Sequence, residues 1–131
     1  MKKVMVFGTF DILHEGHLDF FRQAKALGDF LVVVVARNIN VDRIKGHFPL
    51  HDEKRRLDQI RGLDMVDVAV LGHLEDPYRI IREEQPDVIA LGYDQSSYDK
   101  ELYQRFPKTE IVRLKPYKPE IYKSSKLKNK Q

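Results

Sequence analysis

The chain has 131 residues, of which 42% are hydrophobic and 33% charged, as is usual for one globular domain. It contains no cysteine, which excludes disulfides and cysteine-ligated zinc. Its net charge of +3 is unevenly distributed, because the segment from Arg113 onward contains seven Lys or Arg and only one Glu. Such a basic tail could bind nucleic acid or a phosphorylated ligand, or could be the solvated face of a helix.

The N-terminal residues MKK lead directly into a strand-length apolar segment, which is not the pattern of a signal peptide. The longest apolar run, FLVVVVA, is far too short to span a membrane. We therefore expect a cytoplasmic protein with a single domain over residues 1–131 and no membrane partner.

Apolar strands and amphipathic helices alternate along the chain. In chain order the pattern predicts a strand at 3–8, a helix at 17–28, a strand at 30–37, a loop at 38–51, a helix at 52–63, a strand at 66–72, a helix at 76–85, a strand at 86–92, a helix at 97–106, a strand at 109–115 and a last helix from about residue 119. Gly28 is the expected C-cap of the first helix, and Asp52 the expected N-cap of the second.

This alternation predicts an α/β fold, namely a single Rossmann-like domain with a five-stranded parallel sheet and helices on both faces. Ligands of such sheets bind outside the carboxyl ends of the strands, where the strand order reverses. Polar or glycine residues follow four strands at that edge: 8–11, 37–38, 72–73 and 92–95.

The stretch GTFDILHEGH, residues 8–17, places His14 and His17 three apart at the start of a helix. The zinc motif H-E-x-x-H needs histidines four apart, and nothing favours Asp11 or His73 as a third ligand. Two partly buried histidines that only cap the helix remain a second interpretation. The third is phosphate chemistry, because a helix N-terminus attracts anions and imidazoles donate hydrogen bonds to a crowded phosphorus centre.

Two glycines in the same stretch suit the phosphate interpretation. Gly8 allows a tight exit from the strand, and Gly16 allows a phosphate to approach the backbone closely. Asp11 has two interpretations: an acceptor for a metal or an orienting hydrogen bond, or a turn residue that satisfies local backbone amides. No cysteine exists and no serine lies near this turn, so direct in-line transfer is the simplest chemistry.

GTFDILHEGH closely resembles the G-x-F-D-x-x-H-x-G-H signature of the cytidylyltransferase-like nucleotidyltransferases. These enzymes transfer a nucleoside monophosphate from a nucleoside triphosphate to a phosphorylated acceptor and release pyrophosphate. KSSK, at 123–126, partly resembles their second signature, and Lys45 and Arg56 match basic residues of the family, with Arg55 as the alternative register. LGYDQ, at 91–95, lies where the family lines its base pocket.

The resemblance implies a site of fifteen residues. The expected catalytic residues are His14, His17, Lys45 and Arg56, of which the last two neutralise the departing pyrophosphate. The expected nucleotide-binding residues are Gly8, Thr9, Phe10, Asp11, Gly16, Gly92, Tyr93, Asp94, Ser124, Ser125 and Lys126. No protein metal ligand is implied, because Mg²⁺ is carried mainly by the ATP phosphates.

The segments ARNINVDRIKG, AVLG and PDVIALGYDQ look most like those of archaeal-type FAD synthases. The resemblance therefore implies ATP and FMN as substrates, a divalent metal such as Mg²⁺, FAD and pyrophosphate as products, and a homodimer. Glycerol-3-phosphate cytidylyltransferase, another phospho-acceptor enzyme, and a nucleotide sensor without activity are the alternatives. A class I aminoacyl-tRNA synthetase is disfavoured by the short chain, and nucleic-acid binding by the lack of a stacking or groove-binding motif.

Overall fold

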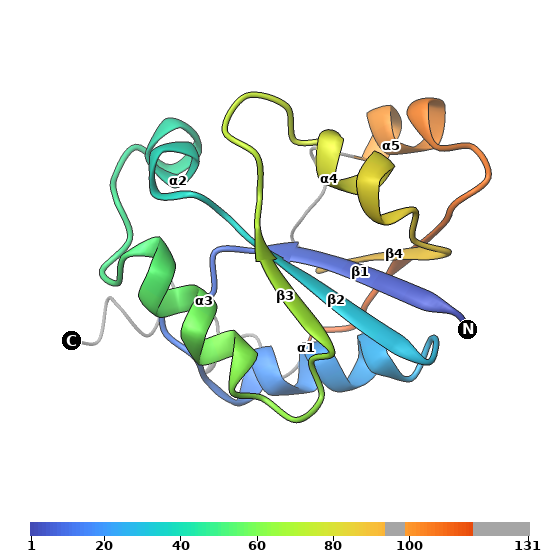
Figure 1. The fold of residues 1–131 in the computed structure, drawn as a ribbon, viewed down its shortest axis with the longest axis horizontal. Coiled ribbons are helices and arrows are strands. Elements are labelled where there is room, and N and C mark those ends of the chain that lie inside the picture. The colour runs from blue at the N-terminus through green and yellow to red at the C-terminus, as the bar shows by residue number, and fades with distance from the viewer. Residues whose placement is uncertain (94–98, 117–131) are drawn as a thin grey trace.

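The computed structural model describes residues 1–93 and 99–116 (Figure 1). Its elements in chain order are β1 (Lys3–Gly8), α1 (Glu15–Lys25), β2 (Phe30–Val35), α2 (Asn38–Lys45), α3 (Glu53–Arg61), β3 (Val68–Leu71), α4 (Arg79–Glu84), β4 (Val88–Leu91), α5 (Asp99–Arg105) and β5 (Glu110–Arg113). The helix expected from about residue 119 lies outside the described residues. No helix within these two ranges is long and apolar enough to cross a membrane.

The five strands form one parallel sheet in the order β3-β2-β1-β4-β5, which confirms the predicted α/β fold. β1 pairs with β2 along its whole length, from Lys3 opposite Phe30 to Gly8 opposite Val35. The chain winds outward from β1 to β3 on one side and then adds β4 and β5 on the other. The strand order therefore reverses beside β1, and the carboxyl end of β1 is the expected position of a ligand crevice.

Helices cover both faces of the sheet, with α1 and α3 below it and α4 and α5 above it in Figure 1. Successive residues of β1 illustrate why its sequence is apolar throughout: Val4 packs with Phe21 of α1 on one face, and Met5 packs with Ile81 of α4 on the other. A strand that is buried on both faces has no solvated side and so no polar alternation.

The largest error of the sequence prediction is the loop expected at 38–51. The structure has α2 in its first half, ended by Gly46, which adopts a left-handed conformation with φ of 80°. Only Val41 of this helix is buried, so the apolar periodicity that identifies a helix is nearly absent.

Other boundaries differ from the prediction by a few residues. Helix α1 begins at Glu15, two residues early, and its C-cap is Ala26 rather than Gly28. β2 ends at Val35, two residues early, and α4 begins at Arg79, three residues late. The N-cap predicted for the next helix is confirmed, because the Asp52 carboxylate accepts hydrogen bonds from two amides of α3.

Candidate functional site

The two histidines lie where β1 gives way to α1. His14 is the N-cap of α1, and its Nδ1 accepts a hydrogen bond of 3.1 Å from the Gly16 amide. Because Nδ1 is an acceptor, the proton of the neutral ring is on Nε2. The His17 ring stacks on that of His14, with centroids 3.9 Å apart and an angle of 25° between the planes. The structure thus brings the predicted pair together at a helix N-terminus.

His17 is held in its neutral form. Burial lowers its pKa to about 3, the positive charges of His14 and Lys45 add to this effect, and the Ile12 carbonyl opposes it. Burial also lowers the pKa of His14. The Nδ1 atom of His17 is buried and meets no partner in normal hydrogen-bond geometry among the described residues. A buried polar atom of this kind is unusual.

We expect a pH dependence of stability from His17. Between pH 3 and 6.5 the unfolded histidine binds a proton and the folded one does not. Its contribution is therefore fully present above pH 6.5 and is lost as the pH falls, by at most about 1.4 kcal/mol per pH unit. Urea unfolding of the wild type and of His17→Gln from pH 4 to 8 tests this. The prediction fails if the difference between the two proteins does not change with pH.

Phe10 supports the His17 ring from the side. Its backbone has a φ of 52°, and its buried side chain meets the His17 ring edge-on, with centroids 5.5 Å apart. The Phe10 ring also lies directly over Gly8, where a Cβ atom would come within 2.5 Å of the ring. The position of the Phe10 ring therefore requires a glycine at position 8, whether or not a ligand also approaches the backbone there.

Replacing Gly8 with alanine should displace the Phe10 ring and lower the free energy of unfolding by about 1–3 kcal/mol. Gly62→Ala is the matched control, since its Cβ would meet nothing nearer than 3.5 Å. Thermal or urea unfolding of the two variants gives the comparison. Equal stability of both variants would show that the turn adapts to the added methyl group.

Asp11 is buried and links two distant segments. Its carboxylate accepts hydrogen bonds of 2.7 Å from the Leu50 amide and 2.8 Å from the His51 amide. The amides that it satisfies are about forty residues away in the chain, so these two contacts are not the local ones of a turn residue. Asp11 holds the segment between α2 and α3 against the turn that follows β1.

Arg56 is completely buried and holds together three segments around the same turn. Its Nε donates to the His51 carbonyl at 2.9 Å, its Nη1 to the Thr9 carbonyl at 2.8 Å and its Nη2 to Asn38 Oδ1 at 2.8 Å. Burial lowers the pKa of Arg56, and nearby carboxylates, Asp11 foremost, oppose that shift. The guanidinium is bonded to three protein groups, and its role in neutralising the pyrophosphate stays a prediction.

The remaining predicted residues fall into two groups. Lys45 is exposed in the last turn of α2, close enough for its charge to act on His17. Gly92 and Tyr93 come directly after β4, where the Gly92 carbonyl accepts a hydrogen bond of 2.6 Å from Arg113 and Tyr93 is exposed. Asp94, Ser124, Ser125 and Lys126 lie outside the described residues. Among the residues that are described, no group of three or more His, Asp or Glu is arranged to hold a metal ion.

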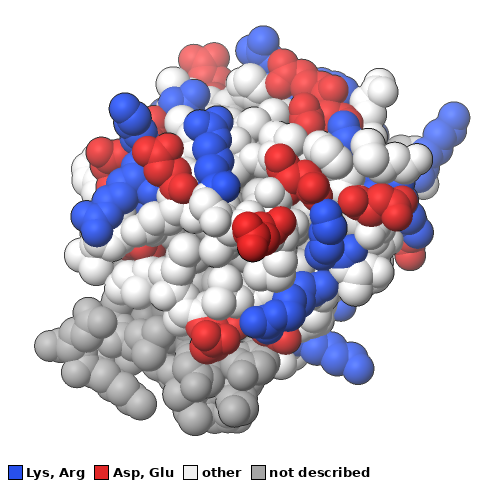
Figure 2. Space-filling model, turned by 60° about the horizontal axis from the view of Figure 1, so that its bottom comes forward, with Lys and Arg blue, Asp and Glu red and all other residues white. Residues whose placement is uncertain are grey.

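On the face that carries α1, the described residues present charged side chains of both signs. In Figure 2, Lys and Arg side chains are interspersed with Asp and Glu over this face. Such mixing lacks the continuous positive surface that tracks a nucleic-acid backbone.

Comparison with known proteins gives a consistent result. The family model described as cytidylyltransferase-like matches residues 5–130. An FAD synthase of Aciduliprofundum boonei is 48% identical over 121 residues, which are 89% of this chain and 80% of the relative. An FAD synthase of Thermoplasma volcanium is 42% identical over 134 residues, covering 99% of this chain and 94% of the relative.

A solved structure also matches closely. It is the crystal structure of a lipopolysaccharide core biosynthesis protein from Thermoplasma volcanium GSS1, which is 45% identical and superposes with a TM-score of 0.83. The match covers 89% of this chain and 98% of that one. With its histidine pair at the β1–α1 turn and a family match over nearly all its length, this chain belongs to the cytidylyltransferase-like family of nucleotidyltransferases.

Proposed function

We propose that this protein is an FMN adenylyltransferase, which joins the AMP part of ATP to FMN. An oxygen of the FMN phosphate attacks the α-phosphorus of ATP, the bond from that phosphorus to the bridging oxygen breaks, and pyrophosphate leaves with the bond's electrons. FAD is the other product. The attacking oxygen is already anionic near neutral pH, so the protein needs no strong general base.

The observation that carries the proposal is the stacked histidine pair at the N-terminus of α1. A neutral imidazole can donate a hydrogen bond to a phosphate oxygen, and the helix N-terminus adds partial positive charge. Relatives named FAD synthase, 42–48% identical over most of this chain, support ATP and FMN as the substrates. Positioning and electrostatics then account for the rate.

The other roles are proposed from the family resemblance. Lys45, Ser124, Ser125 and Lys126 bind the β- and γ-phosphates, and Gly92, Tyr93 and Asp94 line the base pocket. Mg²⁺ enters as the complex with ATP and neutralises the leaving pyrophosphate. The proposed enzyme is cytoplasmic and forms a homodimer. Light scattering after size-exclusion chromatography would test the homodimer.

Pyrophosphate release should be measured with Mg²⁺ for ATP or CTP, each paired with FMN, glycerol 3-phosphate, phosphopantetheine or a sugar phosphate. The sugar phosphate is included because one solved relative is named for lipopolysaccharide core biosynthesis. We expect release only with ATP and FMN, with FAD detected by chromatography, and its loss when EDTA is added.

Other outcomes separate the alternatives. Release only with CTP and glycerol 3-phosphate would keep the family and replace the substrates. Tight nucleotide binding without release in any pair would favour a nucleotide sensor.

A further inference from the structure

The side chain of Gln23, on α1, holds the backbone of the chain just after β5. Its Nε2 donates to the Lys115 carbonyl at 2.9 Å, and its Oε1 accepts from the Lys115 amide at 3.0 Å. The other hydrogen of Nε2 goes to the Asp19 carboxylate, 2.7 Å away and one turn earlier on the same helix. We call these three contacts the Gln23 clamp. The side-chain amide thus pairs with both polar groups of one backbone residue.

The three contacts agree with only one orientation of the Gln23 amide. In the opposite orientation its NH₂ group would face the Lys115 N–H, and its oxygen would face the Asp19 carboxylate. Gln23 is half-buried, whereas Lys115 is exposed. Two side chains therefore fix the backbone of a residue whose own side chain adds nothing to the core, so the clamp serves the path of the chain.

The clamp lies at the end of a fixed path that leads from β5 to α1. Leu114 is buried, and its amide donates to the Leu91 carbonyl at 2.8 Å. Arg113 donates to the Gly92 carbonyl at 2.6 Å, directly after β4. Residues 113–115 therefore leave β5, at the edge of the sheet, and reach the helix that packs on β1, the middle strand.

The tail beyond this path carries the three residues, beginning at Ser124, that are proposed to bind the β- and γ-phosphates. Gln23 follows His17 by six positions, which is about 9 Å along the helix. Ser124 follows Lys115 by nine positions, and nine residues of extended chain can span about 30 Å. The histidine pair is therefore within reach of a tail that starts from the clamp.

We infer that Gln23 is a positioning residue for nucleotide binding, because it anchors the tail on the helix whose N-terminus carries the histidines. This inference rests on the phosphate-binding role proposed for residues 124–126. A tail that is already fixed at Lys115 loses less conformational entropy when it binds the triphosphate. Gln23 acts through the tail and not on FMN, so its replacement should weaken nucleotide binding and leave the KM for FMN unchanged.

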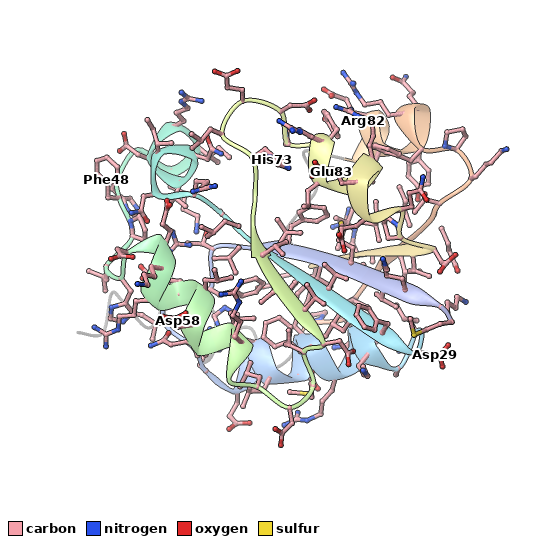
Figure 3. All side chains as sticks on the ribbon, viewed as in Figure 1. Asp29, Phe48, Asp58, His73, Arg82 and Glu83 are labelled. Carbon is pink, nitrogen blue, oxygen red and sulfur yellow. The ribbon has the colours of Figure 1, made fainter. Side chains whose placement is uncertain are left out.

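Gln23→Leu removes the clamp with a side chain of similar size. Its Kd for ATP, measured by calorimetry with Mg²⁺ and without FMN, should rise about tenfold, the equivalent of fixing the backbone of one residue. Asp29→Ala is the matched control. Asp29 also bonds a backbone amide, that of Lys2 at 2.9 Å, but Figure 3 shows it where β1 and β2 begin, at the opposite edge of the sheet. Its Kd for ATP should not change.

A combined variant tests whether Gln23 acts through the tail. Ser124→Ala together with Ser125→Ala should weaken ATP binding, and adding Gln23→Leu should then cost much less than it does alone. Losses that multiply, or a serine variant that binds ATP as tightly as the wild type, would overturn the inference. Amide hydrogen exchange checks the fold: the Lys115 amide should exchange faster in Gln23→Leu, while the amides of β4 should not.

Titration with CTP separates the inference from the proposed function. Wild-type binding of CTP in place of ATP, with the same loss in Gln23→Leu, would overturn the proposed function and support the inference, because both nucleotides carry the triphosphate. An affinity for ATP that Gln23→Leu leaves unchanged, or that Asp29→Ala reduces equally, would overturn the inference alone.

Discussion

Replacing His17 with alanine is expected to lower the turnover number by about 10²-fold or more, the usual cost of removing one aligned donor. The ring is fixed by its stack on His14 and by the edge of Phe10, so little reorganisation is needed when a phosphate binds. It is also neutral, with a pKa of about 3, and so acts by hydrogen bonding across the neutral pH range. The measurement is pyrophosphate release at saturating ATP and FMN.

His47→Ala is the matched control, because His47 is an exposed histidine just after α2, outside the stacked pair. It should retain the wild-type turnover. Circular dichroism and unfolding in urea establish that His17→Ala remains folded at the assay temperature. A turnover in His17→Ala within about twofold of the wild type would contradict its role in transition-state stabilisation and favour the purely structural interpretation of the pair.

The sequence was sufficient for the strands because each has a strong local signal. FLVVVV in β2 is apolar without alternation, as a strand covered on both faces must be, and KVMVFG in β1 shows the same pattern. Helix α2 was missed because it buries only Val41 and begins without a side-chain cap. Its N-terminus is held instead by tertiary hydrogen bonds, from the Asn38 amide to Glu53 and from Arg56 to the Asn38 side chain. Contacts of this kind leave no pattern in the local sequence.

The site shows the same limit at the level of single residues. The spacing of His14 and His17 identifies them, because both lie within one short motif at the end of a strand. The contacts of Asp11 with amides about forty residues away follow only from the fold.

The buried contacts of Asp11 and Arg56 have a common consequence for the site. Asp11 fixes the amides of Leu50 and His51, and Arg56 fixes the His51 carbonyl together with the Thr9 carbonyl. The turn that carries the histidines and the segment that follows Lys45 are therefore held in one arrangement. A lysine on an exposed helix end can act at a fixed place only if the segment around it is anchored in this way.

Arg56→Met is expected to lower the free energy of unfolding by about 3 kcal/mol or more, because each hydrogen-bonding group left without its partner costs about 1–3 kcal/mol. The three groups that Arg56 serves, two carbonyls and the Asn38 amide oxygen, are partly buried and would lose their donor. This is a large part of the 5–15 kcal/mol that stabilises a typical domain. Urea unfolding gives the value, and Arg55→Ala, an exposed neighbour on the same helix, is the control.

The same variants decide how Arg56 acts. If Arg56 positions the site through the protein, Arg56→Lys should recover part of both the stability and the turnover, because an ammonium can still reach one of the three acceptors. If Arg56 instead contacts pyrophosphate directly, turnover should fall in Arg56→Met while its stability stays close to that of Arg55→Ala. The three hydrogen bonds and the complete burial of the guanidinium favour the first outcome, in which loss of activity follows loss of structure.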